Sequence, residues 1–89
     1  MDDKIRALLE RVYYAESIMN IALSEIAVEA QRYTGIELHG DYVAGDGAIL
    51  SWDDESYNHN VIPVEDFFEE VAKNPNKHFT EDDLRGMSI

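Results

Sequence analysis

A long helical apolar pattern constrains this chain more than any other feature. Residues 2–33 contain no Gly or Pro, and Gly35 stands where a helix C-terminal stop belongs. Apolar side chains recur there at alternating spacings of three and four, the pattern of one helix face. The stripe consists of Ile5, Leu9, Val12, Met19, Leu23, Ile26, Ala30 and Tyr33, with Glu16 as its exception. The sequence therefore predicts one helix over residues 2–33.

The length of this helix leaves two arrangements open. Thirty-two residues at 1.5 Å each span about 48 Å, whereas a compact domain of this chain's length has a radius of gyration of about 12 Å. The helix must either bend, near Ser17 to Ser24, or extend past the domain and pack on another copy. The apolar stripe then faces the core or forms a dimer seam, and we favour the core.

The rest of the chain predicts a small sheet followed by short helices. Turn-forming Gly and Asp residues punctuate the stretch after the first helix. Short strands are expected near 36–39 or 41–44, at 48–52 and near 57–62. Pro63 suits the start of a helix over 64–73, which Asn74-Pro75-Asn76 ends, and Thr80 is the expected cap of a last helix.

These elements make one domain of residues 1–89 in the α+β class. The predicted architecture is a long N-terminal helix packed on a small antiparallel sheet of two or three strands, with one or two short C-terminal helices. A chain of this length buries roughly 60% of the surface that it exposes when unfolded, which is enough for it to fold alone with a small margin of stability.

The charge is strongly acidic and unevenly distributed. Nineteen Asp and Glu oppose seven Lys and Arg, a formal net charge of −12. Residues 1–36 have six acids and four bases, whereas residues 37–89 have thirteen acids and three bases. Solubility needs a magnitude of only about 2–8 in a small domain. A surface of this kind repels nucleic acid and anionic membranes and attracts basic proteins.

Several classes of chemical site have no signature here. The chain has no cysteine, so Cys-based zinc sites and disulfides are excluded. Its three histidines are far apart in sequence. The stretch DDESYNHN lacks both the Gly and the ligand spacing of a calcium loop, and HGDYVAGDG lacks that spacing. No nucleophile elbow, phosphate loop or cationic cluster is visible. We expect no metal, no cofactor and no enzymatic activity.

We expect a cytoplasmic protein without a membrane partner. No run of 18 apolar residues exists to span a bilayer. The start MDDKIRALLE is acidic and amphipathic, whereas a secretory signal has a basic start and an apolar stretch.

The stretch SWDDES places Asp53, Asp54 and Glu55 side by side in the expected hairpin loop. Local structure does not explain these three acids, because no helix dipole is present to favour them. Acids at a helix start have such a reason, worth about 0.3–1 kcal/mol each. Glu69 and Glu70 lie away from the helix start and lack this benefit. Each also follows another acid by four residues, and such like-charge pairs destabilise a helix by about 0.2–0.5 kcal/mol.

We interpret the acids of residues 37–89 as a partner-binding face. Carboxylates about 5–6 Å apart on a helix give a local charge density comparable to that of one DNA strand, which carries a charge per about 3.4 Å of axis. Such a face could occupy the basic groove of a nucleic-acid-binding protein. Trp52 and Tyr57 could add contact area, although Trp52 alternatively packs in the core. The predicted partner-binding residues are Trp52, Asp53, Asp54, Glu55, Tyr57, Glu65, Asp66, Glu69, Glu70, Glu81, Asp82 and Asp83.

The order of elements and the charge balance resemble those of small acidic phage-encoded inhibitors, in particular anti-CRISPR proteins that act as DNA mimics. The portion AILSWDDESYNHNVIPVEDFF is similar to a strand-turn-strand-Pro-helix pattern found in small phage proteins. The resemblance implies inhibition by binding, a CRISPR effector as one partner, host cytoplasm as the location, and neither catalysis nor direct contact with nucleic acid. The mild charge of residues 1–36 departs from it, so the face should lie in residues 37–89.

The leading prediction is a non-enzymatic acidic inhibitor that binds a basic nucleic-acid-binding surface of a partner protein. An immunity or antitoxin protein that neutralises a basic toxin would share the electrostatics and differ in its partner. An oligomeric structural subunit would instead use residues 2–33 to form a homodimer.

Overall fold

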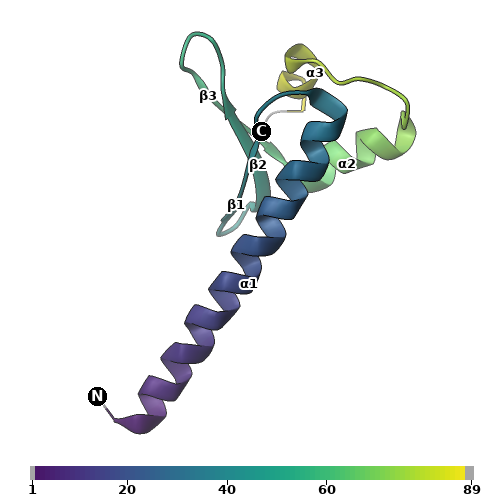
Figure 1. Cartoon of the computed structure of the whole chain (residues 1–89). Coiled ribbons are helices and arrows are strands. Elements are labelled where there is room, and N and C mark those ends of the chain that lie inside the picture. Colours follow the sequence, from purple (N-terminus) through teal and green to yellow (C-terminus); the bar gives the residue numbers. More distant parts are fainter. Residues whose placement is uncertain (1, 88–89) are drawn as a thin grey trace.

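The structure, a computed structural model, describes residues 2–87 and confirms the predicted α+β fold. The elements are α1 Asp3–Thr34, β1 His39–Val43, β2 Gly47–Asp53, β3 His59–Pro63, α2 Val64–Lys73 and α3 Glu81–Arg85 (Figure 1). The three strands form an antiparallel sheet in the order β1-β2-β3. The long first helix, the three strands and both short C-terminal helices therefore appear in the expected order.

Both ends of α1 have caps that explain its bounds. The Asp2 carboxylate accepts a hydrogen bond from the backbone N–H of Ile5 at 2.9 Å. Gly35 takes the left-handed conformation, with φ of 67°, and donates its N–H to the Gln31 carbonyl at 2.8 Å. Glycine adopts this conformation without the steric cost of a Cβ. The helix continues unbroken through residues 17–24, so of the two arrangements it is the extended one that forms.

The N-terminal part of α1 extends far beyond the sheet (Figure 1). Burial on this helix begins only at Leu23 and continues through Ala27, Ala30 and Thr34. The molecule measures 53 × 29 × 21 Å, with a radius of gyration of 16.1 Å. We call residues 3–22 the arm and residues 23–87 the head. The prediction that the apolar stripe faces the core is correct from Leu23 onward and wrong for the arm.

The core of the head lies between the end of α1, one face of the sheet and α2. Leu50 on β2 pairs with Ile62 on β3, and neither is exposed to solvent. The ring of Phe67 on α2 meets that of Phe79 edge to face, with centroids 5.5 Å apart. The core cluster consists of Ala27, Ala30, Leu38, Leu50, Trp52, Ile62, Phe67, Val71, Phe79 and Leu84.

β1 crosses α1 in close contact at Gly40. A Cβ at this position would overlap the backbone carbonyl oxygen of Leu23 and lie 2.9 Å from its carbonyl carbon. A residue with a side chain does not fit there, which is why glycine occupies the crossing. The Gln31 side chain also donates to the Leu38 carbonyl at 3.0 Å, so the chain after α1 is held against the helix.

Candidate interaction surfaces

The hairpin loop between β2 and β3 is organised by the Asp54 carboxylate. Its Oδ1 accepts backbone N–H groups from Ser56 and Asn58, each at 2.9 Å, and its Oδ2 accepts the Asn60 side chain at 3.4 Å. The Asn58 backbone N–H is the largest cause that holds the pKa of Asp54 below its ordinary value. The interpretation that local structure does not explain this acid is therefore wrong for Asp54, which shapes its own loop.

Tyr57 lies in the same loop in an unusual backbone conformation. It is the one non-glycine residue among residues 2–87 with a positive φ, 62°, and its N–H donates to the Asp54 carbonyl at 2.9 Å. A left-handed conformation costs a side-chain-bearing residue about 1–2 kcal/mol. The residue is nevertheless 91% exposed. A large aromatic ring is thus held in solvent at an energetic cost, which marks a candidate contact residue.

The acids at the start of α3 have mainly structural partners. Thr80 and Asp83 form a capping box, in which the Asp83 carboxylate accepts the Thr80 backbone N–H at 2.8 Å and the Thr80 hydroxyl accepts the Asp83 N–H at 3.2 Å. The Thr80 backbone N–H is the largest cause that lowers the pKa of Asp83. Asp83 also pairs with Lys77 at 3.5 Å. This carboxylate is therefore engaged within the head.

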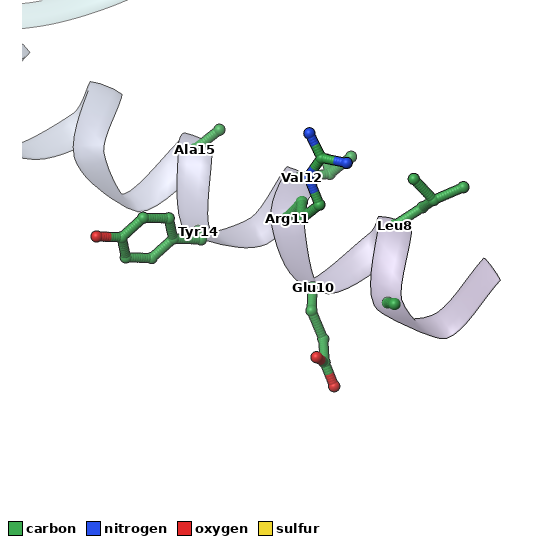
Figure 2. A pocket seen from close by; sticks show the side chains of 7 residues that line it. Leu8, Glu10, Arg11, Val12, Tyr14 and Ala15 are labelled. Atoms are coloured by element: carbon green, nitrogen blue, oxygen red, sulfur yellow. The ribbon is translucent and has the colours of Figure 1, made fainter. Parts of the chain in front are cut away.

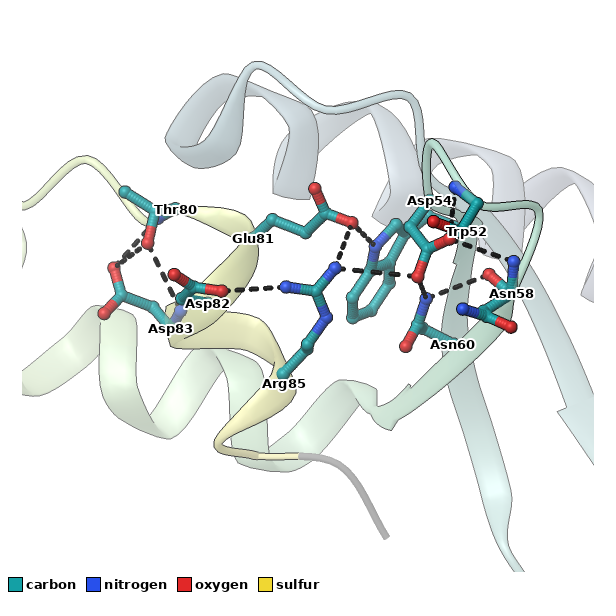
Figure 3. A network of polar contacts seen from close by, with 10 residues as sticks. Trp52, Asp54, Asn58, Asn60, Thr80, Glu81, Asp82, Asp83 and Arg85 are labelled. Carbon is teal, nitrogen blue, oxygen red and sulfur yellow. Dashed lines mark hydrogen bonds and ion pairs between the residues drawn. The ribbon is translucent and has the colours of Figure 1, made fainter.

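Arg85 joins α3 to the hairpin loop (Figure 3). Its guanidinium contacts Asp82 at 2.8 Å, Glu81 at 2.9 Å and Asp54 at 3.6 Å. Glu81 in turn accepts the indole N–H of Trp52 at 3.1 Å. Two groups of predicted site residues, on the loop and on α3, are thereby brought together.

Trp52 does not belong to the binding face. Only 2% of it is exposed, and it is part of the core cluster. Its position on β2 points the ring toward the side of the sheet that also carries Leu50, because alternate residues of a strand share a face. The prediction that Trp52 contacts a partner is therefore wrong, and the core alternative is correct.

The four acids of α2 form a separate group. α2 follows Pro63, which pairs with Ile49, whereas the hairpin loop lies at the other end of β3, where His59 pairs with Asp53. Glu65, Asp66 and Glu69 are exposed, and Glu70 pairs with Lys73 at 3.5 Å. The structure therefore brings the hairpin and α3 acids together, and it places the start of α2 at the far end of the sheet.

The arm presents apolar side chains that the head leaves uncovered. The helix face that packs in the head from Leu23 onward continues along the arm as Ile5, Leu8, Leu9, Val12 and Met19, and Val12 is 57% exposed. Figure 2 shows Leu8 and Tyr14 projecting from different sides of the uncovered helix. Contiguous apolar surface of this kind marks an interaction site.

Two features of these surfaces were absent from the sequence expectations. Tyr14, Ile18 and Ile21 form a second apolar face of the arm, and they are 70%, 52% and 62% exposed. Their spacing of four and three residues was a visible signal, and a helix that is apolar on more than one side is usually covered. Arg85 gave no such signal, because its partner Asp54 is distant in sequence.

Two classes of site find no support in the described residues. Across residues 2–87, no three His, Asp or Glu side chains are grouped so that they could hold a metal ion. In the same part of the chain, no helix has the combination of length and apolar character that crossing a membrane requires.

In comparisons with protein-family models, curated proteins and solved structures, nothing matches this chain.

Proposed function

We propose that this chain is a non-enzymatic cytoplasmic inhibitor whose head covers a basic, nucleic-acid-binding surface of a partner protein. The charge distribution supports this proposal. Residues 23–87 contain fifteen acids and four bases, a net charge of −11, whereas the arm has three of each. A surface with this excess of one sign steers oppositely charged partners toward it.

The observation that carries the proposal is the arrangement at the tip of the β2–β3 hairpin. Asp54 and Arg85 hold the loop beside α3. Asp53, Glu55 and Tyr57 are exposed at the loop and Asp82 is exposed on α3, with Asp53 at 3.0 Å from His59 and Asp82 at 2.8 Å from Arg85. We call Asp53, Glu55, Tyr57 and Asp82 the acidic tip. Interfaces gain much of their energy from a central aromatic side chain, and charged neighbours set the choice of partner.

Carboxylates of the acidic tip can replace phosphates in a basic groove. An Arg or Lys side chain that binds a phosphate oxygen also donates to a carboxylate, with shorter and stronger hydrogen bonds than neutral pairs make. The complex should therefore weaken as salt screens the charges. Nucleic acid should compete with this chain because both would occupy the same groove.

The test is capture of partner proteins from a cell lysate on the immobilised chain. We expect captured proteins to bind nucleic acid, to elute when excess duplex DNA is added, and to be lost between low and moderate salt. Proteins that stay bound in the presence of DNA would contradict the proposal, because mimicry requires mutually exclusive binding.

A pair of matched variants tests the location of the face. Asp53→Asn with Glu55→Gln removes two charges from the acidic tip and leaves Asp54 in place to shape the loop. Asp41→Asn in β1 with Asp46→Asn in the β1–β2 turn removes two charges from the other end of the β1–β2 hairpin. We expect the first variant to capture much less partner than the second, with both folded by circular dichroism. Equal capture would refute the acidic tip as the binding face.

A further inference from the structure

The chain exposes more surface than its mass requires. Its accessible area is 6434 Å², whereas a compact monomer of 10.2 kDa exposes about 5,300 Å². The excess of about 1,100 Å² is larger than the roughly 800 Å² that each partner contributes to a stable interface of standard size. Because burial on α1 begins only at Leu23, much of this excess belongs to the arm.

We propose that the arm pairs with the arm of a second copy, antiparallel, through Ile5, Leu8, Leu9, Val12 and Met19, which we call the arm stripe. The stripe continues the face that packs in the head, and Glu16 is its polar exception. Pairing on this side covers it with an equivalent apolar stripe, as in a two-helix seam. The proposal is independent of the acidic tip, which lies in the head.

Charge favours the antiparallel orientation over the parallel one. The three bases of the arm, Lys4, Arg6 and Arg11, lie in its first half. A parallel pair would place these bases together and set two heads of net charge −11 side by side. An antiparallel pair separates the two heads and the two groups of bases, and it brings the bases of each copy toward the acidic head of the other. Opposite charges then approach and like charges part.

The spacing of the arm stripe also gives the register of the pair. Val12 is the midpoint of Ile5 and Met19, so two copies that cross at Val12 place Ile5 of one opposite Met19 of the other. The resulting interface is the same patch on both chains, as a two-fold dimer requires. Glu16 then lies at the seam opposite Leu8, where it weakens the pair.

Molar mass across a concentration series of the full chain is the first test. We expect light scattering to report twice the 10.2 kDa chain mass within the range of about 1 µM to 1 mM, which corresponds to moderate affinity. Val12→Glu should weaken self-association at least about 100-fold, because two charges would be buried without partners. Glu16→Leu should tighten it. A monomer at every concentration would overturn the proposal.

Ile18→Glu is the matched control on the second apolar face of the arm. It introduces the same charge on a side chain of similar exposure, 52% against 57% for Val12. We expect it to remain dimeric. If Ile18→Glu dissociates the dimer and Val12→Glu does not, the arm stripe is not the seam. Both variants keep the acidic tip, so partner capture by either one reports on the proposed function separately.

Engineered cysteines test the orientation, because the chain has none of its own. Under mild oxidation, Val12→Cys should form a disulfide-linked dimer. Ile5→Cys should cross-link with Met19→Cys when the two chains are mixed, and it should not cross-link with itself. Self-linkage of Ile5→Cys as efficient as its linkage to Met19→Cys would show a parallel pair and overturn the antiparallel assignment.

Discussion

Gly40→Ala should be among the most destabilising small changes in this chain. The added methyl would overlap the Leu23 carbonyl oxygen and lie 2.9 Å from the carbonyl carbon, where ordinary contact begins at 3.4 Å. The obstacle is helix backbone, which cannot rotate away as a side chain can. The carbonyl oxygen is the closer atom, so β1 must move from α1 by roughly 1 Å, and overpacking of this kind costs about 1–3 kcal/mol.

The assay is urea unfolding followed by circular dichroism at one protein concentration for all variants, since a dimer's stability depends on concentration. A domain of this length has a total stability of about 4–13 kcal/mol. With a urea slope near 1 kcal/mol per M, we expect the midpoint to fall by about 2 M. Gly40 is not among the glycines with a positive φ, so backbone strain in the alanine variant adds nothing to the expected loss of stability.

Gly86→Ala is the matched control for the crossing. Gly86 has φ of −64°, and a Cβ there meets the Asp83 carbonyl oxygen at 3.3 Å, with no atom closer. We expect a change within about 0.5 kcal/mol. If the two alanine variants unfold at the same urea concentration, the close approach of β1 and α1 does not limit stability and the reasoning is refuted.

The remaining predictions concern single contacts of the head. Tyr57→Asn should raise the unfolding free energy by about 1 kcal/mol, because Asn tolerates a left-handed conformation, and it should reduce partner capture; a less stable variant would contradict the first part. Glu81→Ala should cost about 1–2 kcal/mol by leaving the Trp52 indole N–H without its acceptor, whereas Glu81→Gln should cost less; both are measured by thermal melting. Asp54 and Asp83 have folded pKa values below the ordinary 3.8. Their stabilising contribution is therefore present above that value and is lost as pH falls from it through the lower folded pKa, so unfolding midpoints should drop as pH falls below about 3.8, and less steeply in Asp54→Asn with Asp83→Asn.

Local signals predicted the helices of this chain well. α2 spans the expected residues 64–73, directly after its N-cap Pro63 and before its C-cap Asn74, and α3 follows its Thr80 cap. Such signals depend on neighbours in sequence, so they can be found without knowledge of the fold. The first strand was less certain, since its bounds at His39–Val43 depend on pairing with β2.

The candidate surface was only partly predictable, because its decisive contacts are long-range. Asp54 and Glu55 are alike in sequence, yet one closes a loop against Arg85 and the other faces solvent. Trp52 finds its acceptor on Glu81, 29 residues later. The periodicity of the first helix identifies an apolar face and carries no information about what covers it. Placement of each acid and of the arm therefore required the structure.

The unbroken course of α1 has a consequence for valency. In the antiparallel dimer, the arms form a rod with one head at each end. The eleven residues from Val12 to Leu23 rise about 16 Å in each copy, so the two heads begin about 33 Å apart. That separation is close to one turn of duplex DNA. A dimer with its heads at this fixed separation gains avidity for a partner whose two basic sites are the same distance apart. Shortening the arm by a few helical turns would remove the gain in avidity, while each head would keep its own affinity for one site.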